Sequence, residues 1–205
     1  MATEQTSCEV LALQEKWAKY EESRRKLEAV SARSSRSTPR RLWPLFDSGN
    51  IQETESLQEV KKFSDEVDAL FLILAGGLGV GKTVAAAWAT DSYQLSALFV
   101  DATEIARASW YDNEAYGRWE RVDLLVIDDL GVEYADKKGG FTMQLDGLLN
   151  SRYNNGLKTI ITTNLTLERF KERYSERVMD RIHECGRFVE LRGRNLRRTD
   201  DLQRT

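Results

Sequence analysis

From Asp68 onward, the apolar residues fall into short unbroken runs, and segments with helical spacing separate these runs. Runs that are apolar at consecutive positions, rather than at every second position, are typical of parallel strands buried on both faces. We predict strands over Ala69–Ala75, Ala97–Asp101, Val122–Asp129, Lys158–Asn164 and Arg187–Leu191. We predict helices over Val84–Thr90, Thr103–Trp110, Gly139–Tyr153 and Leu167–Glu184, the last as one or two helices. This alternation predicts an α/β fold with a three-layer parallel sheet.

A further helix is expected before the first strand. A capping-box pattern begins at Ser56 and ends at Glu59, and the helix that it starts should reach about Glu66. Its inward residues are expected to be Leu57, Val60 and Phe63. By contrast, Tyr111–Trp119 lacks clear periodicity, and we expect a loop or a frayed helix there.

Composition narrows the class of protein. The chain has 205 residues, of which 31% are charged, so it is long enough for one domain and an appendage. Mean hydropathy is -0.52, and neither a bilayer-spanning apolar run nor a signal-peptide pattern is present, so we expect a soluble, cytoplasmic protein without a membrane role. Cys8, Cys185 and the single His183 are too few and too scattered for a zinc site or a disulfide framework. A net charge of -3 argues against capture of nucleic acid by the whole surface but permits local basic patches.

The loop after the first predicted strand carries the strongest chemical signal. Its residues fit G-x-x-x-x-G-K-[ST], a pattern that wraps backbone N–H groups around a phosphate chain and needs glycine where a Cβ would block the approach. The phosphates would lie at the N-terminus of the next helix, where unpaired amides and the helix dipole favour an anion. Lys82 would reach the β- and γ-phosphates and Thr83 would ligate Mg²⁺. We therefore predict a site for ATP and Mg²⁺ formed by Gly76, Gly77, Leu78, Gly79, Val80, Gly81, Lys82 and Thr83.

Two further predicted strands end in polar side chains. Asp128 and Asp129 close one of them and Asn164 closes the other. Ligands of open parallel sheets bind outside the carboxyl ends of strands, so these side chains should converge with the loop on one crevice. We expect Asp128 to hold Mg²⁺, Asp129 to orient or polarise the attacking water, and Asn164 to position that water against the γ-phosphate.

These motifs together resemble a known family. The four motifs are Gly76–Thr83, LLVIDDLGVEY at Leu124–Tyr134, TIITTN at Thr159–Asn164 and SERVMDRI at Ser175–Ile182. In this order they resemble the AAA+ ATPases of the DnaC/IstB group, which comprises bacterial and phage helicase loaders and transposition helper ATPases. The resemblance covers about Leu42 to Arg198 and implies a P-loop NTPase with an AAA+ core of the ASCE type.

The resemblance also implies roles for arginines. Arg181 corresponds to the arginine finger, with Arg177 as the neighbouring arginine of the same box, and Arg197 resembles the second sensor arginine that touches the γ-phosphate in cis. A finger acts on the nucleotide of the adjacent subunit, so hydrolysis is expected to need an ATP-dependent oligomer. Surface salt bridges are the alternative role for these arginines. Many AAA+ proteins carry Glu where this chain has Asp129; the shorter side chain would slow hydrolysis unless Glu133 compensates.

The N-terminal residues predict a separate organisation. Ser7–Val30 shows the narrow apolar seam of a coiled coil, which fits either a helix packed on its own domain or a docking helix for another protein. Ser31–Arg41 is polar and basic and reads as a flexible linker. Leu42–Phe46 is an aromatic cluster that flanks a nucleotide base or seals an edge of the sheet. We thus expect an N-terminal helix at 1–30, a linker at 31–41, the ATPase domain at 42–198 and a tail at 199–205.

Contacts with DNA rest on the resemblance alone. In relatives, the segment after the acidic strand lines the inside of a spiral and touches single-stranded DNA. Here Tyr134 would stack on a base while Lys137 and Lys138 bind phosphates, although a solvated loop ending in glycine would have the same sequence.

Three functions follow from these patterns. The first is an ATP-dependent helicase loader that assembles on single-stranded DNA and binds a replicative helicase through the N-terminal helix. The alternative is a transposition helper ATPase, with a transposase as partner and duplex DNA as track. A third function, from another class, is a non-hydrolysing adaptor that uses ATP as an assembly switch. Asp129 leaves the adaptor open. The residues that argue against it are Lys82, Thr83, Asp128, Asn164 and Arg181.

Overall fold

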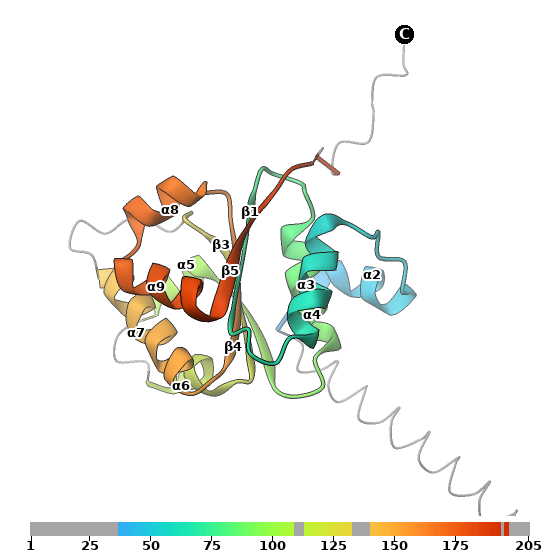
Figure 1. Ribbon diagram of the computed structural model, residues 1–205. Coiled ribbons are helices and arrows are strands. Elements are labelled where there is room, and N and C mark those ends of the chain that lie inside the picture. The colour runs from blue at the N-terminus through green and yellow to red at the C-terminus, as the bar shows by residue number, and fades with distance from the viewer. Residues whose placement is uncertain (1–36, 109–112, 133–139, 194, 197–205) are drawn as a thin grey trace, which may run out of the picture. The chain divides into compact units, whose positions relative to one another are not determined.

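The computed structural model of the chain describes residues 37–108, 113–132, 140–193 and 195–196 (Figure 1). The compact unit that holds these residues begins at Ser37. Within the ranges just given, none of the helices combines the length and apolar character needed to cross a membrane. The predictions that lie outside the described residues concern Ser7–Val30, Glu133, Tyr134, Lys137, Lys138 and Arg197.

Parallel strands form a five-stranded sheet in the order β2-β3-β4-β1-β5. Because β4 lies between β1 and β3, the carboxyl ends of these strands are neighbours at one edge of the sheet. This sheet confirms the predicted parallel α/β fold. The strands are β1 Phe71–Gly76, β2 Ala97–Asp101, β3 Leu124–Leu130, β4 Lys158–Thr163 and β5 Gly186–Leu191.

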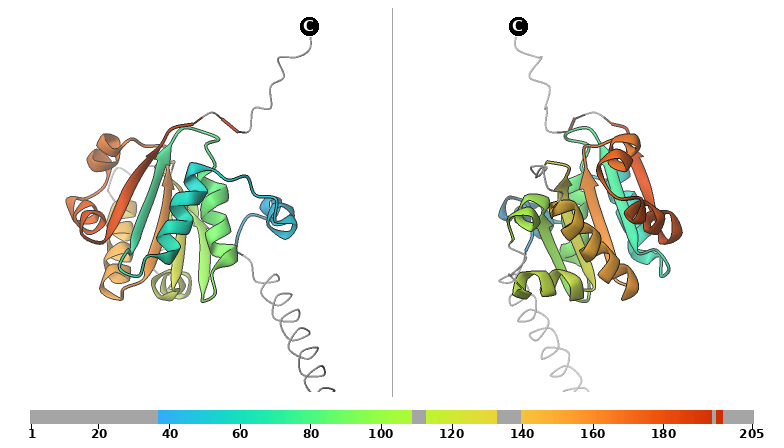
Figure 2. Two further views of the ribbon diagram at one scale, coloured as in Figure 1. Left: turned by 45° about the vertical axis from the view of Figure 1, so that its right-hand side comes forward. Right: turned by 90° about the vertical axis from the view of Figure 1, so that its left-hand side faces the viewer.

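Helices cover both faces of the sheet and complete the three layers (Figure 1, Figure 2). One side holds η1 Arg40–Leu42, α2 Trp43–Ser48, α3 Glu55–Asp65 and α4 Lys82–Ser92. The other side holds α5 Ala102–Arg107, α6 Asn113–Arg121, α7 Gly140–Asn154, α8 Leu167–Arg173 and α9 Glu176–Cys185. Each face has its own apolar core, and successive strand residues such as Val126 and Ile127 belong to opposite cores. The strands are apolar at consecutive positions because both of their faces are covered.

The start of α3 differs from the prediction. The hydroxyl of Thr54, not of Ser56, caps the helix and accepts a hydrogen bond from the Leu57 N–H at 3.2 Å. Ser56 is buried and its hydroxyl donates instead to the main-chain oxygen of Val80 at 3.2 Å. The prediction of Ser56 as the capping residue was therefore wrong, whereas Leu57, Val60 and Phe63 are buried as predicted. Within Tyr111–Trp119, a helix, α6, begins at Asn113.

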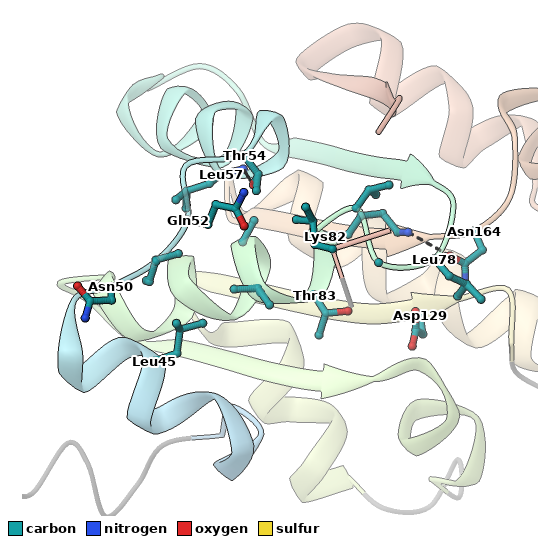
Figure 3. Close-up of a pocket in the computed structure, with 17 residues that line it drawn as sticks. Leu45, Asn50, Gln52, Thr54, Leu57, Leu78, Lys82, Thr83, Asp129 and Asn164 are labelled. Carbon is teal, nitrogen blue, oxygen red and sulfur yellow. Dashed lines mark hydrogen bonds between the residues drawn. The ribbon is translucent and has the colours of Figure 1, made fainter. Parts of the chain in front are cut away.

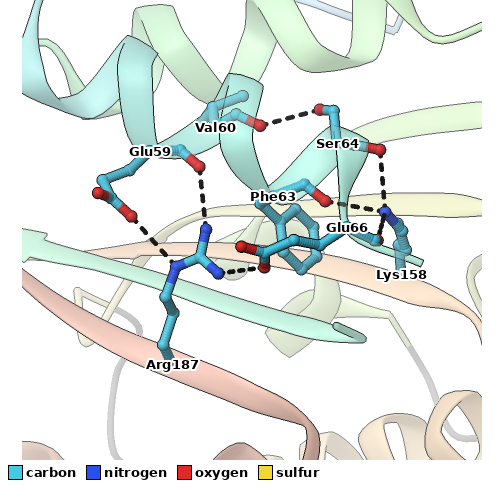
Figure 4. A network of polar contacts seen from close by, with 7 residues as sticks. All are labelled: Glu59, Val60, Phe63, Ser64, Glu66, Lys158 and Arg187. Carbon is cyan, nitrogen blue, oxygen red and sulfur yellow. Dashed lines mark hydrogen bonds and ion pairs between the residues drawn. The ribbon is translucent and has the colours of Figure 1, made fainter. Parts of the chain in front are cut away.

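A polar network connects the C-terminal half of α3 to the first residues of β4 and β5 (Figure 4). On β5, Arg187 pairs with Glu59 at 3.1 Å and also with Glu66. On β4, the Lys158 amine donates at 2.8, 3.1 and 2.6 Å to the main-chain oxygens of Phe63, Ser64 and Glu66. A cation at this position satisfies the last carbonyls of the helix and opposes the negative end of its dipole.

The segment that we predicted as a linker is described from Ser37 onward. The Ser37 hydroxyl accepts a hydrogen bond from the N–H of Phe99, on the edge strand β2, at 2.7 Å. Thr38 is buried, and its hydroxyl accepts a hydrogen bond from the Trp43 indole at 3.1 Å. Ser37–Arg41 therefore packs with the sheet domain, which we had expected to begin at Leu42.

Candidate nucleotide-binding site

The loop between β1 and α4 holds the glycine-rich pattern, and its backbone needs glycine at defined positions. Gly79 and Gly81 have φ angles of 81° and 95°, which residues with a Cβ rarely adopt. A Cβ on Gly76 would lie 2.7 Å from the main-chain oxygen of Leu191. α4 begins directly after Gly81, so the unpaired N–H groups of its first turn lie at the loop. The start of α4 therefore suits a phosphate chain.

A cavity of about 410 Å³ opens beside this loop, within the size range of small-ligand pockets. In Figure 3 the cavity is elongated, with Leu45 and Asn50 at one end and Asp129 and Asn164 at the other. The loop residues from Leu78 to Thr83 line the space between them. The end at Leu45 offers apolar and amide side chains to a base, and the end at Asp129 and Asn164 offers polar groups beside the phosphate-binding loop.

Lys82, the first residue of α4, directs its amine into the polar end of the cavity. The side chain is 6% exposed. Its Nζ donates to the main-chain oxygens of Gly76 at 2.7 Å and Gly77 at 2.8 Å, and to Oδ1 of Asn164 at 3.0 Å (Figure 3). Two predicted site residues that are distant in sequence, Lys82 and Asn164, are thus in direct contact.

Asp128 lies at the end of β3 and is 6% exposed. The pKa of this carboxyl is raised to about 6, chiefly because the group is buried; the charges of Asp129 and Asp101 also raise it, and hydrogen bonds with Thr162 and Thr83 partly oppose the rise. A divalent cation would offset this buried negative charge, and Mg²⁺ prefers carboxylate, hydroxyl and phosphate oxygens. The residues present therefore fit Mg²⁺, with Asp128 and Thr83 as the candidate ligands.

Asp129 is half-buried and lines the same cavity as Asn164. Its φ angle is 53°, and among the described residues other than glycine it alone has a positive φ. Its main-chain N–H donates to the Thr162 hydroxyl at 2.9 Å. Asp129 and Asn164 thus meet the loop at one end of the cavity. Asp128 does not line the cavity itself, but it is hydrogen-bonded to Thr83, which does.

Arg181, the candidate finger, is held against α7. Its side chain is 18% exposed and lies 3.7 Å from Oδ1 of Asp146. Its guanidinium also donates to Oδ1 of Asn150 and, at 3.0 Å, to the main-chain oxygen of Arg177. Arg177, one turn earlier on α9, is exposed. Neither arginine is among the residues that line the cavity of its own chain.

The end of the cavity at Leu45 was largely missed in the sequence analysis. Asn50, Ile51 and Gln52 line it, but they carry no motif and no periodic pattern. Leu45 also lines it, so the Leu42–Phe46 cluster contributes to the site through this residue.

Two further residues at the site were not singled out. Leu196 lines the cavity, and its N–H donates to the main-chain oxygen of Gly79 at 3.0 Å. Thr162 lies within the TIITTN motif, but the sequence analysis assigned a role only to the last residue of that motif, Asn164. The Thr162 hydroxyl donates to Oδ1 of Asp128 at 2.6 Å.

The strand order, the phosphate-binding loop and the acid pair define a P-loop NTPase of the AAA+ type. The chain belongs to the family of IstB-like ATP-binding proteins, because the model of that family matches residues 46–203. The family confirms the DnaC/IstB resemblance and shows an ATP-binding protein. No curated protein matches the sequence.

Solved structures of replication proteins share the fold. The crystal structure of DnaI is 26% identical over 69% of this chain and 82% of the DnaI chain, with a TM-score of 0.55. The DnaC helicase loader is 23% identical over 69% of this chain and 93% of that chain, with a TM-score of 0.58. AMPPCP-bound DnaA from Aquifex aeolicus is 21% identical over 73% of this chain and 51% of that chain, with a TM-score of 0.59. This chain spans 44 to 51% of the length of the first replication initiators that it matches.

Proposed function

We propose that this protein hydrolyses ATP with Mg²⁺, assembles on single-stranded DNA and helps to load a replicative helicase. One observation carries the ATPase proposal: Asp129 and Asn164 meet the phosphate-binding loop at one end of a single cavity, and Asp128 is hydrogen-bonded to Thr83 of that motif. A protein that bound ATP only as a ligand would need neither a second acid nor an amide beside the γ-phosphate position.

In the proposed reaction, the loop amides and the Lys82 amine bind the β- and γ-phosphates. Mg²⁺, held by Thr83 and Asp128, supplies positive charge to the phosphate oxygens. Asp129 orients and polarises the attacking water, and Asn164 positions that water against the γ-phosphate. The 3.0 Å contact between Lys82 and Asn164 supports this role, because it places the amide beside the γ-phosphate-binding amine.

We propose that Arg181 acts as a finger on the nucleotide of an adjacent subunit. To do so, its side chain has to leave Asn150 and Asp146, so assembly must provide a better partner than α7 does. Turnover by the isolated chain is therefore expected to be slow. Arg197 is proposed to touch the γ-phosphate of its own subunit, and the neighbouring Leu196 at the cavity supports that placement.

The DNA and helicase roles are proposed from the family and the structural neighbours. DnaC is described as a helicase loader, and one DnaA structure holds single-stranded DNA with AMPPCP. By analogy, Tyr134, Lys137 and Lys138 would contact DNA, and the helix predicted over Ser7–Val30 would bind the helicase. The family description, which names IstB, favours the alternative of a transposition helper that acts with a transposase on duplex DNA.

ATP turnover by the full chain tests the proposal. We expect the rate per subunit to rise with protein concentration and with single-stranded DNA, because a finger in trans requires assembly. Arg181→Ala is expected to lower turnover on the order of 1,000-fold, since a finger stabilises charge that develops in the transition state. Stimulation by duplex DNA alone would favour the transposition helper. Tight ATP binding without turnover under any condition would favour the adaptor.

A mixing experiment separates a finger in trans from a merely structural arginine. Arg181→Ala lacks the finger, whereas Lys82→Ala lacks nucleotide binding but keeps the finger. Mixed assemblies of the two inactive variants should regain part of the turnover, and a mixture that stays inactive would contradict action in trans. Arg177→Ala is the matched control on the same helix; if it alone loses turnover, the finger is Arg177.

A further inference from the structure

The end of β3 contains a β-bulge at the acid pair. Along β3 and β4, Ile127 pairs with Ile161 and Leu130 pairs with Thr163, so the register shifts between these pairs. Two residues of β3, Asp128 and Asp129, therefore lie opposite Thr162 alone. The positive φ of Asp129 accommodates the extra residue.

The bulge changes which face of the sheet each residue points to. In a regular strand, side chains alternate, so Asp129 would lie on the same face as Ile127 and Leu130 on the opposite one. Instead, Leu130 is buried in the same core as Ile127, and Asp129 lines the nucleotide cavity on the α4 side. The bulge thus allows both acids to serve one site.

One buried hydroxyl holds this arrangement together. Thr162 is 0% exposed. Its hydroxyl donates to Oδ1 of Asp128 at 2.6 Å and accepts the main-chain N–H of Asp129 at 2.9 Å. A hydroxyl has one proton to donate, so this proton is committed to the acid, while a lone pair binds the N–H that the bulge takes out of the ladder. The same atom therefore fixes the side chain of one acid and the backbone of the other.

We propose that Thr162 is a positioning residue for ATP hydrolysis, which keeps the metal-binding acid Asp128 and the water-polarising acid Asp129 on the same side of the sheet. The inference rests on the proposed ATPase function. Thr162 acts through the acids and contacts neither phosphate nor water in this role. Without its hydroxyl, Asp129 would keep its charge but lose its direction, and Asp128 would present Mg²⁺ with a less fixed oxygen.

The neighbouring Thr163 provides a matched control. It is also 0% exposed, and its hydroxyl donates to the main-chain oxygen of Leu130 at 2.6 Å and accepts the N–H of Leu165 at 3.1 Å. It therefore makes the same number of hydrogen bonds to β3 and the following turn, but touches no acid. A purely structural effect of losing a threonine hydroxyl should be similar at both positions.

Steady-state kinetics of the full chain test the proposal with Thr162→Val, Thr162→Ala, Thr162→Ser and Thr163→Val. Removing the Thr162 hydroxyl should lower kcat about 20-fold and raise the Mg²⁺ concentration for half-maximal rate about fivefold, while KM for ATP changes less than about twofold. Thr162→Ser should recover most of the rate because it keeps the hydroxyl. Thr163→Val should stay within about twofold of the unaltered protein, with a shift in unfolding temperature similar to that of Thr162→Val.

Equal losses in kcat for Thr162→Val and Thr163→Val, or no recovery in Thr162→Ser, would overturn the positioning role. If Thr162→Val does not fold, Thr162→Ala supplies the same comparison without a methyl group facing the acid. If the unaltered protein itself shows no turnover, the proposed ATPase function fails. The positioning role of Thr162 is then tested by the binding of a fluorescent ATP analogue with and without Mg²⁺. Mg²⁺ should then strengthen binding about fivefold less in Thr162→Val than in Thr163→Val, and equal strengthening would reject the proposal.

Discussion

Asp128→Asn is expected to make the nucleotide-free protein more stable at neutral pH and to remove most of its ATP hydrolysis. Burial raises the pKa of Asp128 to about 6 from its ordinary 3.8, so folding favours the protonated carboxyl. The cost of folding with a charged Asp128 grows between pH 3.8 and about 6 and is fully present above that range. Asparagine carries no charge, and its amide oxygen can still accept the hydrogen bond of Thr162.

The expected gain in unfolding free energy is about 3 kcal/mol above pH 6, from a pKa raised to about 6, and it should vanish below pH 3.8. Turnover should fall on the order of 1,000-fold, since an amide is a poor ligand for Mg²⁺. Thermal unfolding at pH 7.5 and at pH 3.5, without Mg²⁺, measures the first effect, and phosphate release measures the second.

Asp129→Asn is the natural comparison for this variant. Asp129 is half-buried, so removing its charge should change stability less, whereas turnover should still fall. An Asp128→Asn protein that is no more stable than the unaltered chain at pH 7.5 would show that the carboxyl is better solvated than its burial implies.

Lys82→Ala is expected to weaken ATP binding on the order of 1,000-fold, because a charge-assisted contact to the β- and γ-phosphates is lost from a buried position. Lys82 is 6% exposed, and its amine is directed into the polar end of the cavity. Titration with a fluorescent ATP analogue measures the loss directly, before any hydrolysis.

Lys61→Ala is the control for the loss of a lysine charge. Lys61 is 44% exposed and pairs with Glu53 at 2.8 Å on the same side of the sheet. Because exposed ion pairs contribute little, Lys61→Ala should bind ATP within about twofold of the affinity of the unaltered protein. Affinity within tenfold of the unaltered protein for Lys82→Ala would mean that ATP binds elsewhere or in another orientation.

The sheet and the loop could be predicted because their signals are local. A strand such as Phe71–Gly76 is apolar at consecutive positions because both of its faces are covered. The loop needs glycine where φ is positive, and the spacing of its glycines can be recognised in the sequence. The cap of α3 could not be chosen in the same way. Thr54 and Ser56 are both good caps, and the decision came from the tertiary contact between Ser56 and Val80.

The acids and arginines show where sequence reasoning ends. Consecutive Asp128 and Asp129 do not reveal a bulge, because a regular strand with the second acid on the opposite face has the same sequence. Likewise, the sequence of an amphipathic helix does not reveal whether one of its charged side chains is bound to another element of the fold. Arg181 is engaged by Asn150 and Asp146, which lie about 30 residues away in the chain and could be paired with it only through the fold.

The contacts of Lys82 change how an ATP affinity should be understood for this protein. Gly76, Gly77 and Asn164 all accept hydrogen bonds from this amine, so a phosphate that binds the amine has to compete with internal acceptors. The free energy that Lys82 contributes to ATP binding is then the difference between two sets of hydrogen bonds of one ammonium group. If the Lys82 amine turns to the γ-phosphate as proposed, the amide of Asn164 is released from it, and occupancy of the loop would be linked to the proposed placement of the attacking water.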